Sequence, residues 1–467
     1  MTAQIKFYYK NVFADVLGPE HGISKPQFEN LANHVGPFIK QLNQMRPKLP
    51  YRDLPFKSEI TARVKQVGDS IKGNCENFVV LGIGGSALGN IALQTALNPY
   101  MYNLDDSARK TPRLFVFDNV DPAQLKSFLQ WVEPRLEKTV FNVISKSGQT
   151  AETAAQLQVI TELITRKLGA DALKKHIIAI TDPKEGTMRK IADSQGLTTL
   201  EVPPGVGGRW SVLSAVGLLS AYVCGIDIDA LLAGARDMDK RVSDENFHKN
   251  PAAINAAINW HFYNRGKHIS VLMPYCYALK DLSDWFRQLW AESLGKAVNL
   301  KGEQVNVGPT PVKALGTTDQ HSQVQLYREG PNDKIFTFLQ VNDFGNADIT
   351  IGPAPGIAPE LGYLAGAKMS KLLNSEKIAT EYALAASKRP SMTVYFDKVD
   401  AYAVGQFICF YEASTSIAGL LFEIDAYDQP AVELGKLATF ALMGKTGHEK
   451  LANEIKPFLK PDGNYLL

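Results

Sequence analysis

The regular alternation of short apolar runs with long helical patterns is the feature that most constrains how this chain folds. In the first half, the apolar runs end in Gly, Ser, Asp or Pro, which is typical of βαβ units around a parallel sheet. These runs cover residues 77–82, 113–118, 139–145, 176–181 and 198–202. An apolar stripe of helical period over residues 151–168 predicts an intervening helix. The pattern predicts an α/β fold with a doubly wound parallel sheet.

A second set of the same kind predicts a second such layer. Its strands are expected at residues 268–273, 334–341 and 392–396, and its helices at 279–294, 360–388 and 401–422. The Pro/Gly-rich segments 308–315 and 352–359 are expected to be ordered loops. The predicted organisation is a helical N-terminal extension (1–48), a first domain (49–225), a helical bridge (226–265), a second domain (266–436) and a helical tail (437–467).

The charge balance excludes a global attraction to nucleic acid or to an anionic membrane. Lys and Arg total 50 and Asp and Glu total 48, a net charge of +2, so an anionic ligand must be held by local groups. The longest apolar stretch, 212–226, falls short of the ~20 residues that span a bilayer and predicts a buried helix. Four single cysteines without a CxxC pair, and a start without a secretory apolar segment, predict a reducing cytoplasm.

The first candidate motif is a glycine-rich segment, residues 79–89, at the end of an apolar run. It contains Gly82, Gly84, Gly85 and Ser86. Glycines let a ligand approach the free backbone N–H groups of a helix start, which suit an anion or a hydroxyl-rich ligand. The segment also fits the dinucleotide pattern G-x-G-x-x-A, but that pattern needs an acidic residue about 20 positions later. Asp118 follows Ala87 by 31 positions, which leaves tight strand-to-helix packing as the main alternative.

A second apolar run leads into a hydroxyl-rich helix start at residues 143–153. Its polar groups are Ser145, Lys146, Ser147 and Thr150. Hydroxyl groups and helix N-terminal amides can surround the oxygens of a phosphate monoester, and the lysine adds local positive charge. Each hydroxyl alone could be a helix cap, but three within six residues favour phosphate binding.

Two further segments supply candidate charged groups. In residues 203–211, glycines lead to Arg209 before an apolar helix, where a guanidinium could stabilise negative charge that develops on oxygen; a solvated arginine is the alternative. In residues 285–296, an amphipathic helix carries Glu292 close to two tryptophans. A partly desolvated carboxylate is a stronger base toward a carbon acid; an exposed helical glutamate is the alternative.

A histidine and a lysine complete the set of candidates. His321 lies between Gln320 and Ser322, and imidazole is suited to proton transfer near neutral pH; a structural histidine is the alternative. The histidines show no metal-ligand spacing, so no metal is expected. Gln429 and Lys436 lie near the end of the second layer, where Lys436 could also be a simple surface charge.

Taken together and in this order, the motifs between residues 77 and 436 resemble the glucose-6-phosphate isomerase family. The SKSGQT segment is similar to the phosphate-binding element of sugar isomerase (SIS) domains, which also occur in amidotransferases and non-enzymatic sugar-phosphate sensors. GGRWS, AESLGK, DQHS and DQPAVELGK resemble the arginine, base, histidine and lysine motifs of the isomerase branch. Two positions differ: Trp210 stands where the family usually has Phe or Tyr, and Ala431 where it usually has Gly.

The resemblance implies two SIS-type domains and the reversible isomerisation of glucose 6-phosphate to fructose 6-phosphate in glycolysis and gluconeogenesis, with no cofactor. It implies that the phosphate and nearby oxygens are bound by Gly85, Ser86, Ser145, Lys146, Ser147 and Thr150. It also assigns ring opening to His321 and Lys436, proton transfer between C2 and C1 to Glu292, stabilisation of the cis-enediolate to Arg209, and positioning of sugar hydroxyls to Gln288 and Gln429.

The resemblance further implies a homodimer in which His321 reaches the site of the other subunit, with no nucleic-acid or membrane partner. The central spatial expectation is that Glu292 and His321 converge on one pocket whose floor is the segment 145–150. Three alternatives stay open: a sugar-phosphate-binding regulator without turnover, a nicotinamide-dependent dehydrogenase that uses the glycine-rich segment, and an isomerase that also accepts mannose 6-phosphate.

Overall fold

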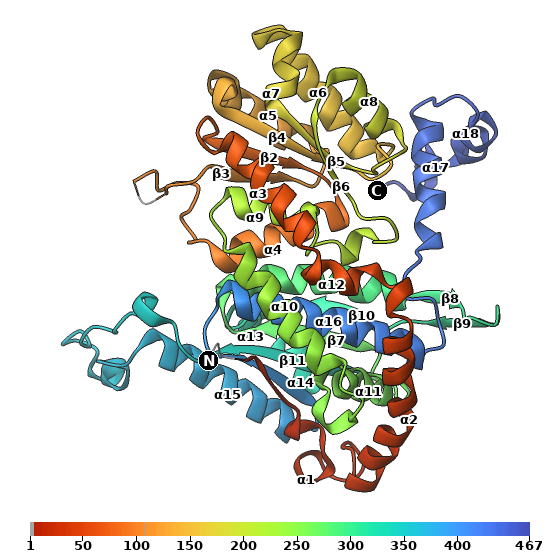
Figure 1. The fold of residues 1–467 in the computed structure, drawn as a ribbon. Helices are drawn as coiled ribbons and strands as arrows, with labels where there is room; N and C mark the ends of the chain where they lie inside the picture. The colour runs from red at the N-terminus through yellow and green to blue at the C-terminus, as the bar shows by residue number, and fades with distance from the viewer. Residues whose placement is uncertain (1–3, 108) are drawn as a thin grey trace.

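Two sheets of mainly parallel strands form the frame of the molecule and lie one above the other in Figure 1. This computed structural model describes residues 4–107 and 109–467, so the first three residues of the predicted N-terminal extension lie outside the described residues. The upper sheet has the strand order β3-β2-β4-β5-β6, all parallel. Its strands are β2 (Asn77–Leu81), β3 (Arg113–Phe117), β4 (Thr139–Ile144), β5 (Ile177–Thr181) and β6 (Thr198–Glu201). All five lie where the sequence predicts them.

Helices cover both faces of the upper sheet, which is why its central strands are apolar on both sides. One face carries α3 (Ser58–Lys72), α4 (Leu88–Leu97) and α9 (Ala215–Val223). The other carries α5 (Pro122–Val132), α6 (Ala151–Leu168), α7 (Leu173–His176) and α8 (Thr187–Gln195). The apolar stretch 212–226 forms the buried helix α9, as predicted.

The lower sheet has the order β1-β12-β11-β7-β10, in which only β1 is antiparallel to its neighbour. Its strands are β1 (Lys6–Tyr8), β7 (Ile269–Pro274), β10 (Thr310–Lys313), β11 (Lys334–Val341) and β12 (Ser391–Phe396). Strand β1 is not among the predicted strands, and the prediction of a loop at 308–315 is wrong because β10 lies there. Pro311 is tolerated because β10 is an edge strand, where a missing N–H leaves no ladder bond unmade.

The remaining helices surround the lower sheet and the two chain ends. They are α1 (Ala14–Leu17), α2 (Lys25–Gln44), α10 (Ile228–Val242), α11 (Pro251–Tyr263), α12 (Lys280–Leu294), α13 (Thr318–Ser322), α14 (Val324–Glu329), α15 (Met369–Ala386), α16 (Ala401–Leu421), α17 (Glu433–Leu442) and α18 (Glu449–Ile455). The predicted helix at 360–388 starts too early: a short 3-10 turn covers Pro359–Leu364, and α15 begins only at Met369. A two-stranded hairpin, β8 (Lys296–Val298) with β9 (Gln304–Val307), follows α12.

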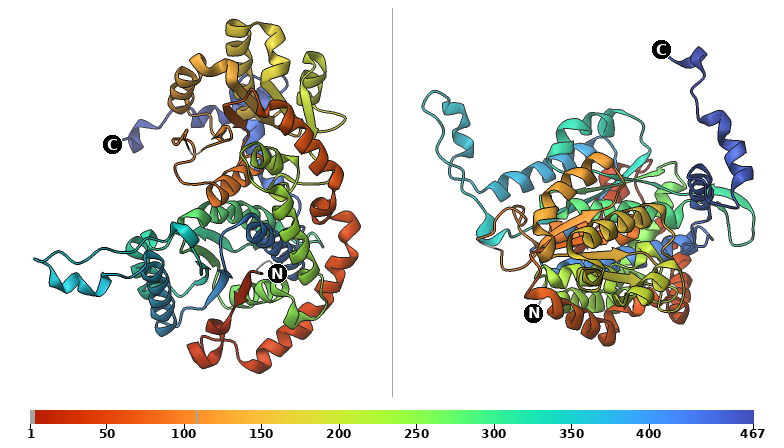
Figure 2. Two further views of the ribbon diagram at one scale, coloured as in Figure 1. Left: turned by 60° about the vertical axis from the view of Figure 1, so that its left-hand side comes forward. Right: turned by 90° about the horizontal axis from the view of Figure 1, so that it is seen from above.

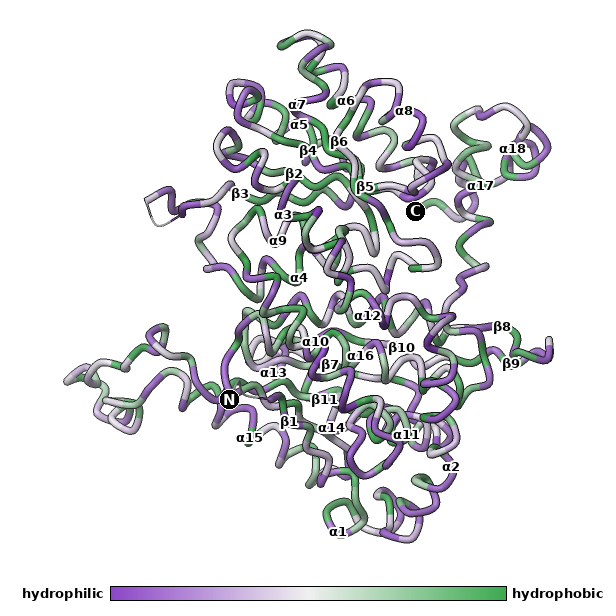
Figure 3. Tube along the Cα trace, viewed as in Figure 1, coloured by the Kyte–Doolittle hydropathy of each residue, from purple (hydrophilic) through white to green (hydrophobic). Residues whose placement is uncertain are grey.

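Helix α16 is the centre of the lower half, and every one of its residues is buried. Helix α10 crosses it so closely that a Cβ at Gly234 would lie 1.9 Å from the carbonyl oxygen of Tyr402, and one at Gly405 would lie 1.9 Å from that of Leu231. Glycine is therefore required on both helices at this crossing. Figure 3 shows apolar residues along the central strands of both sheets.

Helix α12 lies between the two sheets and packs against α4 of the upper half. This arrangement brings the end of α12 toward the loops that follow the upper strands. The C-terminal segment after α16 extends away from the main body, as the right-hand view of Figure 2 shows. Across the described residues, every helix is too short or too polar to span a bilayer.

Candidate active site

The hydroxyl-rich segment 145–150 forms a tight loop between the carboxyl end of β4 and the start of α6. Ser145 Oγ accepts a hydrogen bond from the Gly148 N–H at 3.0 Å, and Ser147 Oγ accepts one from the Gln149 N–H at 3.1 Å. These bonds use the serine oxygens as acceptors and leave their protons for an external acceptor. Thr150 occupies the N-cap position of α6 without making a side-chain capping bond. Helix capping therefore does not explain the threonine.

The loop is anchored to the next strand rather than held by its own helix alone. The carbonyl oxygen of Lys146 accepts hydrogen bonds from Thr181 Oγ1 at 3.1 Å and from the Asp182 N–H at 3.3 Å. The Lys146 side chain itself is exposed. A fixed loop of hydroxyls at a helix N-terminus is a suitable site for a phosphate group.

The glycine-rich loop after β2 contacts the loop that carries Arg209. Gly85 approaches the backbone of Gly208 so closely that a Cβ on Gly85 would lie 2.1 Å from the Gly208 carbonyl carbon. A Cβ on Gly84 would lie 2.9 Å from Gln288 Nε2 of α12. Ser86, at the end of this loop, is partly exposed. Three motifs that are far apart in the sequence therefore meet at this point.

Arg209 makes more hydrogen bonds than the other candidate residues and is only 3% exposed. Its Nε donates to Ser293 Oγ at 2.7 Å, and its Nη2 donates to the carbonyl oxygens of Ala426 at 2.7 Å and Asp428 at 3.0 Å. Its Nη1 donates to Gln429 Oε1 at 2.7 Å. The solvated alternative is wrong, since the guanidinium is buried among acceptors.

Glu292 lies in the last turn of α12 and faces Arg209. Its Oε2 is 3.4 Å from Arg209 Nη1, and its Oε1 accepts a hydrogen bond from Gln288 Nε2 at 3.0 Å. Its side chain is 33% exposed, so the carboxylate is accessible from one side. Burial lowers the pKa of Arg209, and the nearby Glu292 carboxylate opposes that effect. A guanidinium remains charged despite such a shift.

The structure thus brings Arg209, Glu292, Gln288 and Gln429 into one hydrogen-bonded cluster, but it leaves two of the predicted catalytic residues, Lys436 and His321, outside it. Lys436 is exposed on α17, where its ammonium pairs with Glu433 at 2.7 Å. Helix α17 packs near α6, the helix that follows the segment 145–150. Lys436 therefore lies on a helix that contacts α6, and it makes no bond to the cluster.

His321 is exposed on α13 and makes no hydrogen bond or ion pair with the other candidates in the part of the chain described. Its neighbours fix the helix: Gln320 Oε1 accepts from the Tyr275 hydroxyl at 2.8 Å, and Asp319 Oδ2 accepts from the Leu315 N–H at 2.7 Å. His321 and Glu292 of the same chain are expected to lie in one pocket, but they make no contact with each other.

Sequence reasoning missed Lys296 and Ser293, although both lie in the segment that carries Glu292. Lys296 is 9% exposed, and its ammonium donates to the carbonyl oxygens of Glu292 and Asp428. A lysine four residues after Glu292, just past the end of a helix, was the available signal, because lysines there can bond the last free carbonyls.

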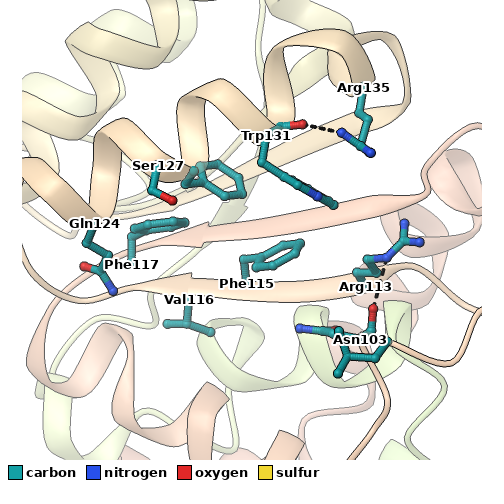
Figure 4. A pocket seen from close by; sticks show the side chains of 11 residues that line it. Asn103, Arg113, Phe115, Val116, Phe117, Gln124, Ser127, Trp131 and Arg135 are labelled. Carbon is teal, nitrogen blue, oxygen red and sulfur yellow. Dashed lines mark hydrogen bonds between the residues drawn. The ribbon is translucent and has the colours of Figure 1, made fainter.

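The hollow shown in Figure 4 lies away from all of these residues. It has a volume of about 580 Å³ and is bounded by β3 and α5. Phe115 and Trp131 line it with ring centroids 5.0 Å apart, and Arg113 and Arg135 flank the indole. None of the candidate residues lines this hollow.

Comparison with known proteins finds one family over most of the chain. Residues 58–455 match the family model described as phosphoglucose isomerase. The chain is 44% identical over 455 residues to a glucose-6-phosphate isomerase of Carboxydothermus hydrogenoformans, covering 97% of each chain. It is 39% identical over 422 residues to one of Thermus thermophilus, covering 89% of this chain and 96% of that one.

Solved structures show the same architecture. A crystal structure of a hypothetical protein from Thermus thermophilus superimposes with a TM-score of 0.83 at 34% identity, covering 94% of this chain and all of that one. A glucose-6-phosphate isomerase of Chlamydia trachomatis superimposes with a TM-score of 0.80 at 21% identity, covering 94% and 91%, and so supports the fold alone. Because the family model matches most of the chain, the chain belongs to the phosphoglucose isomerase family.

Proposed function

We propose that this member of the phosphoglucose isomerase family, which interconverts glucose 6-phosphate and fructose 6-phosphate, does so through ring opening and a cis-enediolate intermediate. The single observation that carries the proposal is the contact between Arg209 and Glu292. A base and a permanent cation 3.4 Å apart are what proton abstraction next to a carbonyl requires. Gln288 and Gln429, which hold these two groups, are the proposed partners of sugar hydroxyls.

Proton transfer is assigned to Glu292 on the basis of its hydrogen bonds. Its carboxylate is oriented by Gln288 on one oxygen and by Arg209 on the other. In this orientation it would take the proton from C2 and return it to C1, which converts aldose to ketose without net oxidation. The electron pair of the broken C2–H bond forms the C1=C2 double bond, the carbonyl oxygen O1 becomes negative, and Arg209 would stabilise it.

The bonds of Arg209 indicate how it would accept the substrate. A guanidinium has five N–H donors, and all five have an acceptor in the structure. The contact with Glu292 is the longest of them, at 3.4 Å. A substrate oxygen would replace this contact most easily, which would also free the carboxylate to act as the base.

The substrate phosphate is assigned to Ser145, Lys146, Ser147 and Thr150, with Gly85 and Ser86 bordering nearby oxygens. The hydroxyl protons and the start of α6 support this assignment. Because this loop belongs to the upper half and Glu292 to the lower half, we also propose the division into a first domain (49–225) and a second domain (266–436) joined by 226–265.

Ring opening is assigned to His321 and Lys436, with His321 acting in the site of a second subunit. The exposure of His321, with no bond to its own cluster in the described residues, supports a homodimer. So does an arm at residues 343–368, which projects on the left of Figure 1 and exposes Ile357 by 97% and Tyr363 by 79%; such apolar surface is typical of an interface. Light scattering with activity across dilution tests this, and a fully active monomer would contradict it.

We propose a cytoplasmic location on the basis of the four buried cysteines, all of which are free thiols in the structure.

Isomerisation of fructose 6-phosphate in deuterated water tests the mechanism. We expect deuterium at C2 of the glucose 6-phosphate formed, because the carboxylate exchanges its proton with solvent. Glu292→Gln should reduce turnover by orders of magnitude and leave fructose 6-phosphate binding nearly unchanged, since the phosphate loop is intact. Wild-type turnover in this variant would show that Glu292 is not the base.

A further inference from the structure

Lys296 is a charged residue buried next to the proposed base. It is the first residue of β8, two residues after the last residue of α12, and its side chain is 7% exposed. Burial lowers the pKa of the Lys296 ammonium, and the nearby Arg209 adds to this effect, while Asp428 opposes it. Placing a lysine here is costly, so its partners need an explanation.

The ammonium of Lys296 connects the end of α12 with Asp428, which lies 132 residues after Lys296. It donates to the carbonyl oxygen of Glu292 at 2.6 Å and to the carbonyl oxygen of Asp428 at 3.0 Å, and it lies 3.4 Å from Asp428 Oδ1. The Glu292 carbonyl is in the last turn of α12 and lacks a partner within its own helix. Lys296 therefore ties the end of the helix that carries the base to the loop that carries Gln429.

Arg209 binds the same loop from the other side. The Asp428 carbonyl accepts from both Lys296 Nζ and Arg209 Nη2, each at 3.0 Å. The next residue, Gln429, presents its Oε1 to Arg209 at 2.7 Å. The position of the guanidinium relative to Glu292 thus depends on where this loop sits, and Lys296 fixes the loop to α12.

We propose that Lys296 is a positioning residue for the isomerisation: it holds the Asp428–Gln429 loop against the end of α12 and thereby keeps Arg209 in place beside Glu292. This inference rests on the proposed function of Glu292 and Arg209. Lys296 takes no proton from the substrate and does not bind the phosphate. Its effect is on the proton-transfer step, because the phosphate loop 145–150 belongs to the other half of the molecule.

The test compares Lys296→Met with Lys301→Met. Lys301 lies on the same hairpin and also reaches across to the segment after α16, with Nζ 2.9 Å from Glu423 Oε2, but both side chains are more than half exposed. The variants are assayed for kcat and KM with fructose 6-phosphate. Their Kd for glucitol 6-phosphate, which lacks a carbonyl and cannot react, is measured by calorimetry.

We expect Lys296→Met to lower kcat by about 10- to 100-fold, the cost of misplacing reacting groups by about 1 Å. The Kd for glucitol 6-phosphate should change by less than about threefold, and Lys301→Met should leave both values unchanged. Lys296→Arg, which keeps the charge, should recover part of kcat. If the methionine variant does not fold, Lys296→Gln, which keeps one donor, is judged by the same two measurements.

Two results would overturn the inference: a wild-type kcat in the Lys296 variant, or a loss of binding as large as the loss of kcat, which would indicate a general structural role. Failure of the proposed function is recognised separately. If Glu292→Gln retains turnover, the assignment of the base is wrong, whatever the Lys296 variants do. If Glu292→Gln is inactive and Lys296→Met is fully active, only the positioning role is wrong.

Discussion

The contact between Gly85 and Gly208 allows a quantitative test of how precisely the loop that carries Arg209 must be placed. In Gly85→Ala, the new Cβ would lie 2.1 Å from the Gly208 carbonyl carbon and 2.6 Å from the Arg209 nitrogen. Ordinary van der Waals contact begins at 3.4 Å, so the first distance is 1.3 Å too short. Both groups are backbone, and no side-chain rotation can relieve the overlap. The two loops must separate by roughly 1 Å.

This separation would act directly on Arg209, the residue after Gly208. Its hydrogen bonds to Ser293 and Gln429 are 2.7 Å long, and an additional 1 Å would take them beyond hydrogen-bond distance. A misplacement of about 1 Å at a reacting centre costs about 10²-fold in rate. We therefore expect kcat/KM to fall about 100-fold, together with a loss of about 1–3 kcal/mol in the free energy of unfolding from overpacking.

Initial rates with fructose 6-phosphate and thermal unfolding of the same preparations measure both quantities. Gly73→Ala is the matched control, because Gly73 has a φ of −73° and nothing within 4 Å of its added Cβ. The control should keep wild-type kcat/KM and stability. Wild-type kcat/KM in Gly85→Ala would refute the reasoning, since it would mean that Arg209 tolerates the displacement or is not needed.

Three further outcomes are expected. Thr150→Ala should raise KM about tenfold with kcat within about twofold in initial-rate assays, because it removes a hydroxyl from the phosphate loop and leaves Glu292 untouched; a lower kcat at unchanged KM would contradict the phosphate assignment. Burial, together with Arg265, lowers the pKa of His261 from 6.5 to about 4, so the unfolded chain binds a proton that the folded chain does not between these pH values. Stability should therefore fall as the pH is lowered from 6.5 to 4, and less so in His261→Gln, as measured by thermal melts; parallel pH profiles would contradict this. Burial raises the pKa of Glu412 well above 4.5, so the folded chain keeps a proton that the unfolded chain releases as the pH rises. The melting temperature of Glu412→Gln minus that of the wild type should therefore increase from pH 5 to pH 8. A difference that stays constant over this range would contradict the prediction.

Most of the upper sheet could be predicted from the sequence because β2, β3, β4 and β5 are largely apolar runs, each followed by a polar or glycine residue. In β4, all six residues are buried, and the hydroxyl-rich loop follows at once. Such runs fit a strand covered on both faces. The predicted functional residues after β2 and β4 lie at the same edge of the sheet, because neighbouring parallel strands bring their carboxyl ends to one edge.

Elements stabilised by tertiary contacts could not be found in the same way. The strand β10 contains Pro311, which argues against a strand unless its position at the sheet edge is known. The three residues of β1 pair with β12, near the other end of the chain, so no local pattern marks them. The predicted helix at 360 is replaced by a turn up to the start of α15 at Met369, because Gly366 adopts a φ of +73° that a helix does not allow.

The candidate site shows the same limit. The sequence identifies the functional group of Arg209 but not its burial, because the acceptors that make burial possible are the backbone carbonyls of Ala426 and Asp428. Backbone carbonyls carry no sequence signal. Lys296 differs in part: its place just past the end of α12 is a sequence signal for bonding to the last carbonyls of that helix, but its bond to the Asp428 carbonyl, 132 residues away, has no such signal.

The bonds of Arg209 also explain why binding and chemistry should respond differently to perturbation. Arg209 follows β6 of the upper sheet, yet the acceptors Ser293, Glu292, Ala426, Asp428 and Gln429 all come from segments of the lower half. The segment 145–150, which we propose binds the phosphate, is by contrast anchored within the upper half by the end of β5. A change that loosens the packing between the halves would displace Arg209 from Glu292 before it disturbs the phosphate loop. Rate should therefore be lost before affinity.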